Sequence, residues 1–316
     1  MSGAFALLLG AMLVAAHGHR PLLLLTRSLV VDPQVSLVAW LVTLLSVVVT
    51  TVAGVAFLGL PGHGGLGPLL GQLNSCWAAL RHGALPSWEQ GSALVGAAAL
   101  IAIAVRVGVV ARRQTIIRRR RRERYRFLLA LVGTKSAQSS TMEMVWLEHE
   151  EMVAFSVAGK PGLIVLSRGV GDQLSPQALA ATIEHERAHL RGHHQFMLDI
   201  VDAVAAALPV APLFRTAPEA LRELVEAAAD GTAVRRCGAG AVRNALESLT
   251  AVPQPGDGLA MAATGTARRL QRLRFGRGAQ PAAVRSFWCA AISVAAAALP
   301  AVLGLGVVVS VACSVG

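Results

Sequence analysis

Four long apolar runs alternate with a single long segment in which apolar and polar positions are mixed. The apolar runs cover about residues 3–19, 36–60, 92–111 and 287–316. The second run holds no charged residue and would be about 37 Å long as a helix, which exceeds the hydrocarbon thickness of a bilayer. We therefore predict a membrane protein, mainly α-helical, with three transmembrane helices in residues 1–111 and a fourth in the last apolar run.

The mixed segment, residues 112–286, is the only part of the sequence long enough for a domain outside the membrane. Two short apolar stretches at 153–157 and 162–167 are separated by a turn sequence rich in glycine and proline, which predicts two strands. Ser175 followed by Pro176 is typical of a helix start. We expect an α+β domain in this segment.

Charge and composition indicate how the chain lies in the membrane. The formal net charge is +11, and 54% of the residues are hydrophobic. Arginines cluster at 112–124, directly after the third apolar run, and such clusters mark the cytoplasmic side. A basic run can also bind nucleic acid, but its place beside a span favours anionic lipid head groups. We expect a multi-pass protein of the cytoplasmic (inner) membrane with a cytoplasmic domain, a lipid bilayer as partner and no direct nucleic-acid partner.

A His-Glu-x-x-His motif lies in the helix that follows Ser175. Its four-residue spacing places His185 and His189 one turn apart on one helix face, where both imidazoles can bind one metal ion. Glu186 is then suited to act as a general base towards water. The alternative is a polar helix that contains two histidines by chance. The motif and its flanking residues favour a Zn²⁺ site with Glu186 as the catalytic residue.

A catalytic zinc site needs a third protein ligand. Glu226 and Asp230 lie one turn apart on a later predicted helix, with only alanines between them, so that helix can approach the first one closely. Glu226 is the candidate ligand, and Asp230 can accept a hydrogen bond from a ligand imidazole. An ordinary surface helix is the alternative, but two carboxylates at this spacing repel each other unless a cation is near.

Three further residues are candidates for the substrate cleft. His193 lies one turn beyond His189 and could line the cleft, although a solvent-exposed histidine at a helix C-terminus is the favoured explanation. Ala154 and Val157 belong to the first predicted strand, against whose edge an extended peptide could add main-chain hydrogen bonds.

The apolar run at 196–214 needs a separate interpretation. A single membrane crossing there would place Glu226 and His185 on opposite sides of the membrane and destroy the site. The run also contains Asp199 and Asp202, which disfavour contact with lipid. We expect a membrane-associated helix and hairpin; a helix buried in a soluble core is the alternative.

These motifs resemble the BlaR/MecR type of integral-membrane zinc metallopeptidase, to which HtpX and the CAAX prenyl proteases are related. The resemblance rests on residues 154–159, 164–167, 174–176, 185–189 and 226–230. It implies a zincin-like domain in which His185, His189 and Glu226 bind zinc, Glu186 is the base, and Asp230 supports the ligands.

The resemblance also implies an activity, a zinc metalloendopeptidase that cleaves a cytoplasmic DNA-binding repressor after a signal from outside. No outer β-lactam-binding domain follows the last apolar run, so we do not expect antibiotic sensing by this chain alone. Alternatives are HtpX-like quality control of membrane proteins and a non-catalytic zinc-binding signalling scaffold. A transporter is disfavoured, because the apolar runs hold few charges and none of them is paired.

Overall fold

The structure is a computed structural model, and it describes residues 2–59, 88–138, 142–251, 259–275 and 281–315. The elements near the N-terminus are α1 (Ser2–His17), α2 (His19–Arg27), α3 (Pro33–Gly59) and α5 (Trp88–Val132). The middle of the chain forms β1 (Gly133–Gln138), β2 (Met142–Leu147), β3 (Ala154–Val157), β4 (Gly162–Ser167), α6 (Arg168–Gln173), α7 (Pro176–Arg191) and α8 (His194–Ala207). The remaining helices are α9 (Pro212–Cys237), α10 (Ala239–Ala251), α11 (Leu259–Phe275) and α12 (Ala282–Val315).

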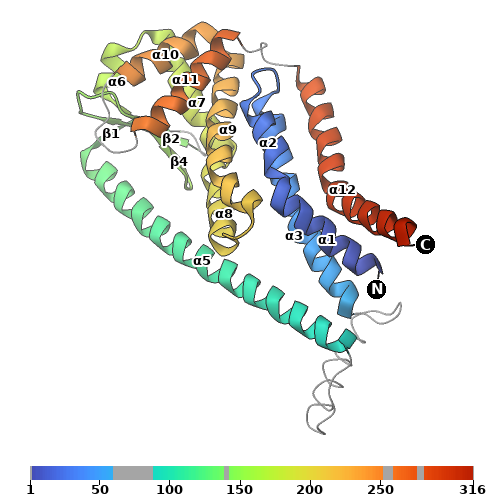
Figure 1. Ribbon diagram of the computed structural model, residues 1–316. Coiled ribbons are helices and arrows are strands. Elements are labelled where there is room, and N and C mark those ends of the chain that lie inside the picture. Colours follow the sequence, from blue (N-terminus) through green and yellow to red (C-terminus); the bar gives the residue numbers. More distant parts are fainter. Residues whose placement is uncertain (1, 60–87, 139–141, 252–258, 276–280, 316) are drawn as a thin grey trace.

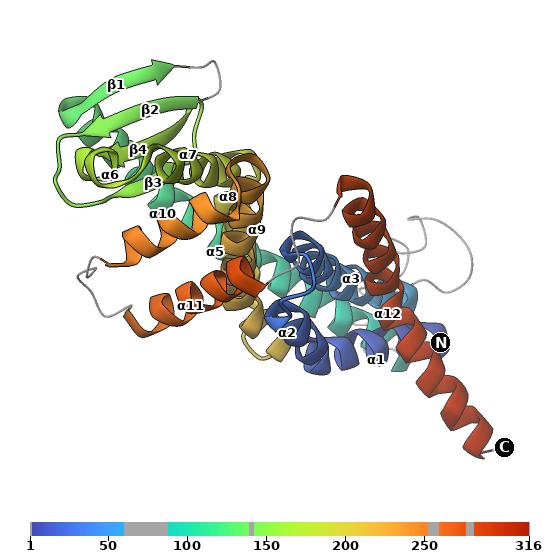
Figure 2. The same cartoon turned by 90° about the horizontal axis from the view of Figure 1, so that it is seen from above.

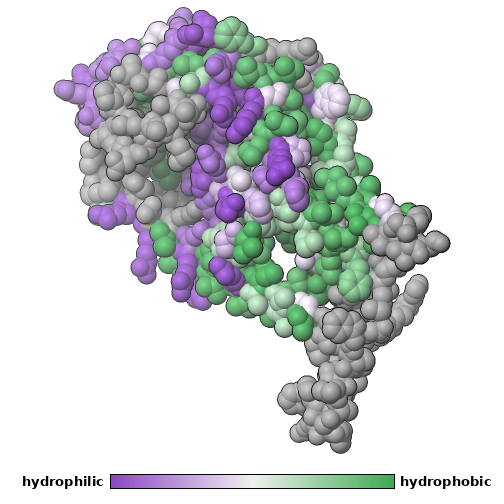
Figure 3. Space-filling model, in the orientation of Figure 1, coloured by the Kyte–Doolittle hydropathy of each residue, from purple (hydrophilic) through white to green (hydrophobic). Residues whose placement is uncertain are grey.

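The described residues include three helices that are long and apolar enough to cross a membrane, at Pro33–Phe57, Val95–Ile117 and Ala282–Ser310. The pair α1 and α2 passes the same test only as one span that is bent by 42°. The structure is therefore mostly helical, with three such spans or four if the bent pair counts as one. Hydrophobic residues cover the end of the molecule formed by these helices, and hydrophilic residues gather over the opposite end (Figure 3).

The helices α1, α3 and α12 pack against one another. Glycines allow α1 and α12 to meet backbone to backbone, because a Cβ atom on Gly10 would lie 1.7 Å from the carbonyl oxygen of Pro300. A Cβ atom on Gly304 would equally lie 1.7 Å from the carbonyl oxygen of Ala6. Small residues at such contacts are typical of helices that associate within membranes.

The helix α5 continues from its apolar half through the basic stretch 112–124 without a break (Figure 1). It joins the bundle of apolar helices to a four-stranded sheet with the order β1-β2-β4-β3, in which β2 and β4 are parallel and the other pairs antiparallel. The sheet lies to one side of the bundle, with α6 and α7 against it, α10 packed on α7, and α11 beyond α10 (Figure 2). The predicted strands are β3 and β4, whereas β1 and β2 were not predicted.

The apolar run 196–214 forms a helical hairpin. It comprises α8, a short connection and the first residues of α9, so the chain turns back rather than crossing once. The hairpin lies between α5, which α8 contacts, and α3, which α9 contacts (Figure 1). Leu213 and Phe214 at the start of α9 are buried in one core together with Trp40 of α3 and Val14 of α1. This core holds the hairpin against the bundle.

A second core lies between the sheet and α7, α9 and α10. It contains Ile164 and Leu166 of β4, Ala178 and Ala181 of α7, and Ala233 of α9. Every residue of β4 is buried, while β3 forms the edge of the sheet beside α7. The two cores meet at α9, and the candidate site is built where α7 crosses this helix.

Candidate metal centre

The helix α7 begins as the sequence predicts. Ser175 is its N-cap and accepts a hydrogen bond from the backbone N–H of Ala178, and Pro176 occupies the first position. The helix then runs unbroken to Arg191, which places the rings of His185 and His189 side by side, with centroids 4.8 Å apart.

The helix α9 supplies the third group. It packs closely against α7, because the buried alanines at 227–229 leave little side-chain volume between the two helices. Glu226 consequently points at the two histidines, and Asp230 lies one turn farther along, almost fully buried.

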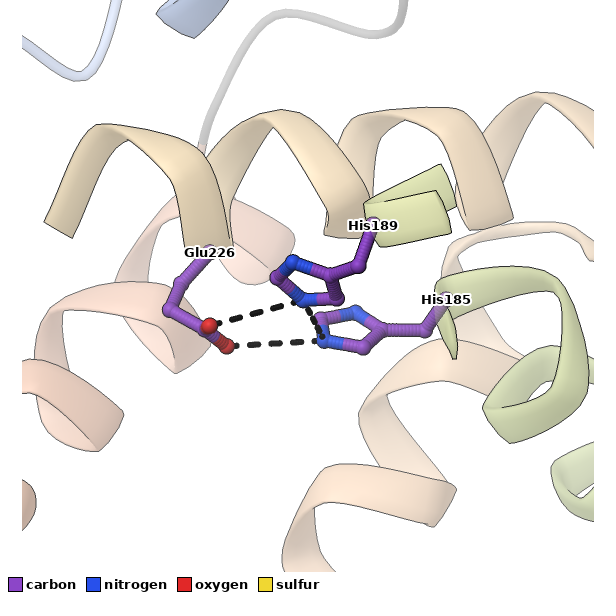
Figure 4. A group of neighbouring side chains, drawn as sticks. All are labelled: His185, His189 and Glu226. Carbon is purple, nitrogen blue, oxygen red and sulfur yellow. Dashed lines mark hydrogen bonds and ion pairs between the residues drawn. The ribbon is translucent and has the colours of Figure 1, made fainter. Parts of the chain in front are cut away.

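The three side chains converge on one point (Figure 4). The Nε2 atoms of His185 and His189 are 3.0 Å apart. Each Nε2 atom lies 3.4 Å from an oxygen of Glu226. Donors around a tetrahedral zinc ion, with Zn–N bonds of about 2.0–2.1 Å, are separated by roughly 3.3 Å. Two imidazoles and one carboxylate at these separations fit a zinc site of the kind that leaves one position open.

Asp230 and Arg269 hold His185 and Glu226 in place from the side opposite the point where the three side chains converge. The Nδ1 atom of His185 lies 3.0 Å from Asp230, which leaves Nε2 directed at the centre. Arg269 of α11 donates two hydrogen bonds to the Asp230 carboxylate, at 2.7 and 2.8 Å. A third nitrogen of Arg269 lies 3.1 Å from Glu226. Asp230 thus fixes the ring of His185, and Arg269 fixes Asp230.

The charges of the site follow from this network. Burial alone would raise the pKa of Glu226, but the hydrogen bond from His185 and the charge of Arg269 lower it to about 2. Burial would lower the pKa of His185, but hydrogen bonds to Asp230 and Glu226 raise it to about 9. Burial lowers the pKa of His189 to about 4. At neutral pH and without metal, the site therefore holds an ionised Glu226, a protonated His185 and a neutral His189.

Glu186 follows His185 on α7 and lines the same cavity as the three clustered groups. Burial raises its pKa, and the charge of His185 and a hydrogen bond with Ser156 of β3 oppose that shift. A carboxylate with a raised pKa is better matched to proton transfer near neutral pH than a free one.

The position of His193 differs from the expectation. The helix α7 ends at Gly192, and His193 adopts the left-handed conformation with φ 48°, so it does not continue the helix face that carries His189. The break instead brings His194, the first residue of α8, towards the site. Its Nδ1 atom lies 3.1 Å from Nδ1 of His189. Burial, followed by the charge of His189, lowers the pKa of His194 to about 4.

A cavity of about 1130 Å³ opens in front of the site. Its wall includes Ala154, Ser156 and His193, so two of the three cleft candidates face it. The third, Val157, is buried against Leu163 and Val165 of β4.

The sequence alone assigns neither Arg269 nor His194 to the support of the metal centre. Arg269 belongs to a basic cluster for which lipid contact is the favoured explanation, and no sequence pattern places it beside Asp230. His194 reaches the site only because the helix ends two residues earlier, at the glycine that follows Arg191.

Comparison with known families gives one result. Residues 118–245 match the sequence profile of peptidase family M48. The matched segment contains α7 and the part of α9 with Glu226 and Asp230, and it ends before α11. The match indicates a metalloprotease domain of a membrane-type family that typically depends on zinc; it does not single out the BlaR/MecR type. No curated protein and no solved structure gives a significant match to the chain.

Proposed function

We propose that this protein is an integral-membrane, zinc-dependent endopeptidase that cleaves a protein substrate at the cytoplasmic surface of the inner membrane. The convergence of His185, His189 and Glu226, with Glu186 beside them, carries the proposal. The M48 match and the apolar helices support the same conclusion independently.

The side chains of this site have different roles in peptide hydrolysis. Zinc, when bound, supplies a Lewis acid that polarises the scissile carbonyl and makes water easier to deprotonate. His185, His189 and Glu226 would hold the ion. Glu186 takes the proton from the attacking water and passes it to the leaving amine, as a general base and then a general acid.

The substrate is held in an extended conformation. The strand β3 is an edge strand beside α7, and Ala154 and Ser156 face the cavity that contains Glu186. A peptide added to this edge gains main-chain hydrogen bonds, and the cavity receives its alternate side chains.

The mechanism is tested by replacing Glu186 with Gln. This change removes the base but leaves the three ligands, so zinc content should stay at the parent level while casein cleavage falls at least 100-fold, an order expected for loss of general-base catalysis. Zinc is measured by atomic emission and cleavage by release of labelled fragments. The matched control is Glu219→Gln on the exposed face of α9, which should cleave as the parent does. Parent-like cleavage by the Glu186 variant would refute the mechanism.

The biological role that we favour is regulated cleavage of a cytoplasmic DNA-binding repressor, which suits the layout of apolar helices around the peptidase domain. The large cavity and the hairpin beside the membrane helices also favour a second candidate, HtpX-like quality control of membrane proteins. A pull-down with the Glu186→Gln variant separates them, because it should capture one dominant DNA-binding protein in the first case and many membrane fragments in the second.

A non-catalytic zinc scaffold is the third role. A scaffold needs the three ligands but has no use for a buried carboxyl group at Glu186. If cells that carry Glu186→Gln behave like cells with the whole gene deleted, the enzyme is favoured over the scaffold.

A further inference from the structure

A second cavity lies on another face of α9, behind the metal centre, and its wall includes Asp230 and Arg269, which support His185 and Glu226. Its volume is about 120 Å³, well above the roughly 10–15 Å³ that one water molecule needs. Its wall comes from the turn before α3, the C-terminal half of α9, and α11. The side chains that give it chemical character are Arg235, Arg269 and Arg272, with Asp32 and Asp230.

The two carboxylates already have hydrogen-bond donors. Asp230 accepts both hydrogen bonds of the Arg269 fork. Asp32 accepts the backbone N–H of Gln34 at the start of α3. Three arginines against two carboxylates leave these side chains with a net charge of +1, because the backbone donor of Asp32 does not cancel its charge.

These two arginines make few interactions with acceptors on the chain. Arg235 donates to the Thr232 hydroxyl at 2.9 Å, and Arg272 donates to the backbone carbonyl of Thr26. The Nε atom of Arg272 is buried and has no hydrogen-bond partner among the residues that the structure describes. Burial lowers the pKa of Arg235, and the nearby charge of Arg285 lowers it further. Several donors with one sign of charge thus face a space in which an anion would satisfy them.

The chemistry of arginine narrows the choice of anion. The planar guanidinium group matches the oxygens of a phosphate or carboxylate, and a phosphate offers enough oxygens for several arginines at once. The cavity is wide enough for the phosphate group, but its volume leaves little room for a large acyl or peptide portion. The rest of the ligand must therefore lie outside.

The location of the cavity indicates which kind of molecule carries the phosphate group. Asp32 directly precedes Pro33, where the first clear candidate span begins, and Arg285 lies in the first turn of α12, where the last one begins. The cavity wall brings the start of α3 and α11 together. Lipid head groups of the same leaflet lie at this level of a membrane protein.

We propose that this cavity binds a phosphate group, presented by the head group of an anionic phospholipid, through Arg235 and Arg272. The site is separate from the substrate cavity. The proposal does not depend on proteolytic activity.

The test uses the full chain in detergent and counts bound lipid by native mass spectrometry during titration with phosphatidylglycerol. Arg235→Gln and Arg272→Gln should each weaken binding about tenfold, the order expected for one charged hydrogen-bond donor. Arg274→Gln is the matched control, because Arg274 lies on the same helix but pairs with Glu247 outside the cavity. The control should bind as the parent does.

Inorganic phosphate, titrated in parallel, distinguishes the two sources of the same group. The lipid assignment is supported if either arginine substitution abolishes phosphatidylglycerol binding and if the parent binds inorganic phosphate much more weakly than it binds the lipid. If the Arg235 and Arg272 variants lose affinity for inorganic phosphate but bind the lipid as the parent does, the lipid head group is not the source of the phosphate. If the control loses as much affinity as the cavity variants for both ligands, the site does not exist. Arg235 is exposed, so its substitution leaves the fold intact even if the Arg272 variant does not fold.

Discussion

A single arginine connects the two acidic residues of the metal centre. Arg269 contacts both Asp230 and Glu226, and Asp230 in turn holds the ring of His185. The candidate metal site is therefore built in three successive contacts, from His185 to the Asp230 carboxylate and from there to Arg269. Outer partners of metal ligands commonly matter for metal affinity nearly as much as the ligands do.

Arg269→Gln should lower zinc affinity about 10- to 100-fold, because Asp230 would remain buried without its charged partner and His185 would lose its fixed orientation. Arg269→Lys should recover only part of this loss, since an ammonium group cannot donate the paired hydrogen bonds. Competition with a fluorescent zinc chelator measures the affinity. If Arg269→Gln binds zinc as tightly as the parent, the supporting role is wrong.

Zinc binding should release about one proton at pH 7. In the metal-free site the pKa of His185 is raised to about 9, so the ring is protonated below that pH and must lose the proton from Nε2 to bind metal. His189 and Glu226, whose pKa values are lowered to about 4 and 2, have no proton to lose. Affinity should accordingly rise with pH up to about 9. Calorimetry in buffers of different ionisation enthalpy counts the protons, and a count near zero contradicts the assignment.

Local spacing explains which site residues the sequence could provide. His185, Glu186 and His189 share one helix, and Glu226 and Asp230 share another, so a helical period relates the members of each group. No helical period relates Arg269 or His194 to these groups. The position of Arg269 depends on how α11 folds back onto α9, and the position of His194 depends on where α7 ends.

The helical hairpin of α8 and α9 leads into the part of α9 that carries Glu226. Its outer helix lies against α5, where a nitrogen of Arg106 is 3.4 Å from the carbonyl oxygen of Ala206 in the last turn of α8. Arg106 lies in the middle of the candidate span Val95–Ile117. A cation near the C-terminal carbonyls of a helix is favourable, more so away from water.

Arg106→Leu should loosen the hairpin by about 1 kcal/mol, because the last carbonyls of α8 lose their donor. Hydrogen exchange of residues 196–214 in nanodiscs should become about fivefold faster. Arg113→Leu, on the exposed basic part of the same helix, is the control and should leave this exchange unchanged. If residues 196–214 exchange at the same rate in both variants, Arg106 does not support the hairpin.

Gly304→Val should separate α12 from α1, because the added side chain would occupy the space of the Ala6 carbonyl group. Overpacking of this kind costs about 3 kcal/mol, and here the backbone itself must move. The thermal unfolding temperature in detergent should drop clearly. Gly306→Val, two residues away with open space around it, should have little effect. A similar drop for both variants would contradict close packing of the two helices.

The elements that the sequence did not predict have a physical explanation. In β2 the buried positions are Glu143 and Val145, so a carboxylate occupies an inward position and the apolar alternation is lost. The helix α5 extends through a run of arginines, because arginine favours helix, whereas from the sequence we interpret this run only as a mark of the membrane boundary. Predicted strands β3 and β4 are short, apolar and separated by a clear turn, and they were found.

At the scale of the whole molecule, the apolar bundle and the part of the chain that holds the candidate site share a core. The core around Trp40 of α3 also contains Leu221 and Leu224 of α9, only a few residues before Glu226. The position of Glu226 therefore depends on how α9 packs against the bundle. This arrangement depends on contacts between distant segments, which sequence periodicity does not reveal.

The place of Arg269 in the chain has a practical consequence for anyone who wishes to study the catalytic part in isolation. A fragment trimmed to residues 118–245 would keep all three ligands and the base but would lack α11. It would also leave the apolar flank of α9 without the helices that cover it. Weak metal binding or inactivity in such a fragment would report the missing arginine and the lost packing, and would say nothing against the function proposed for the full chain.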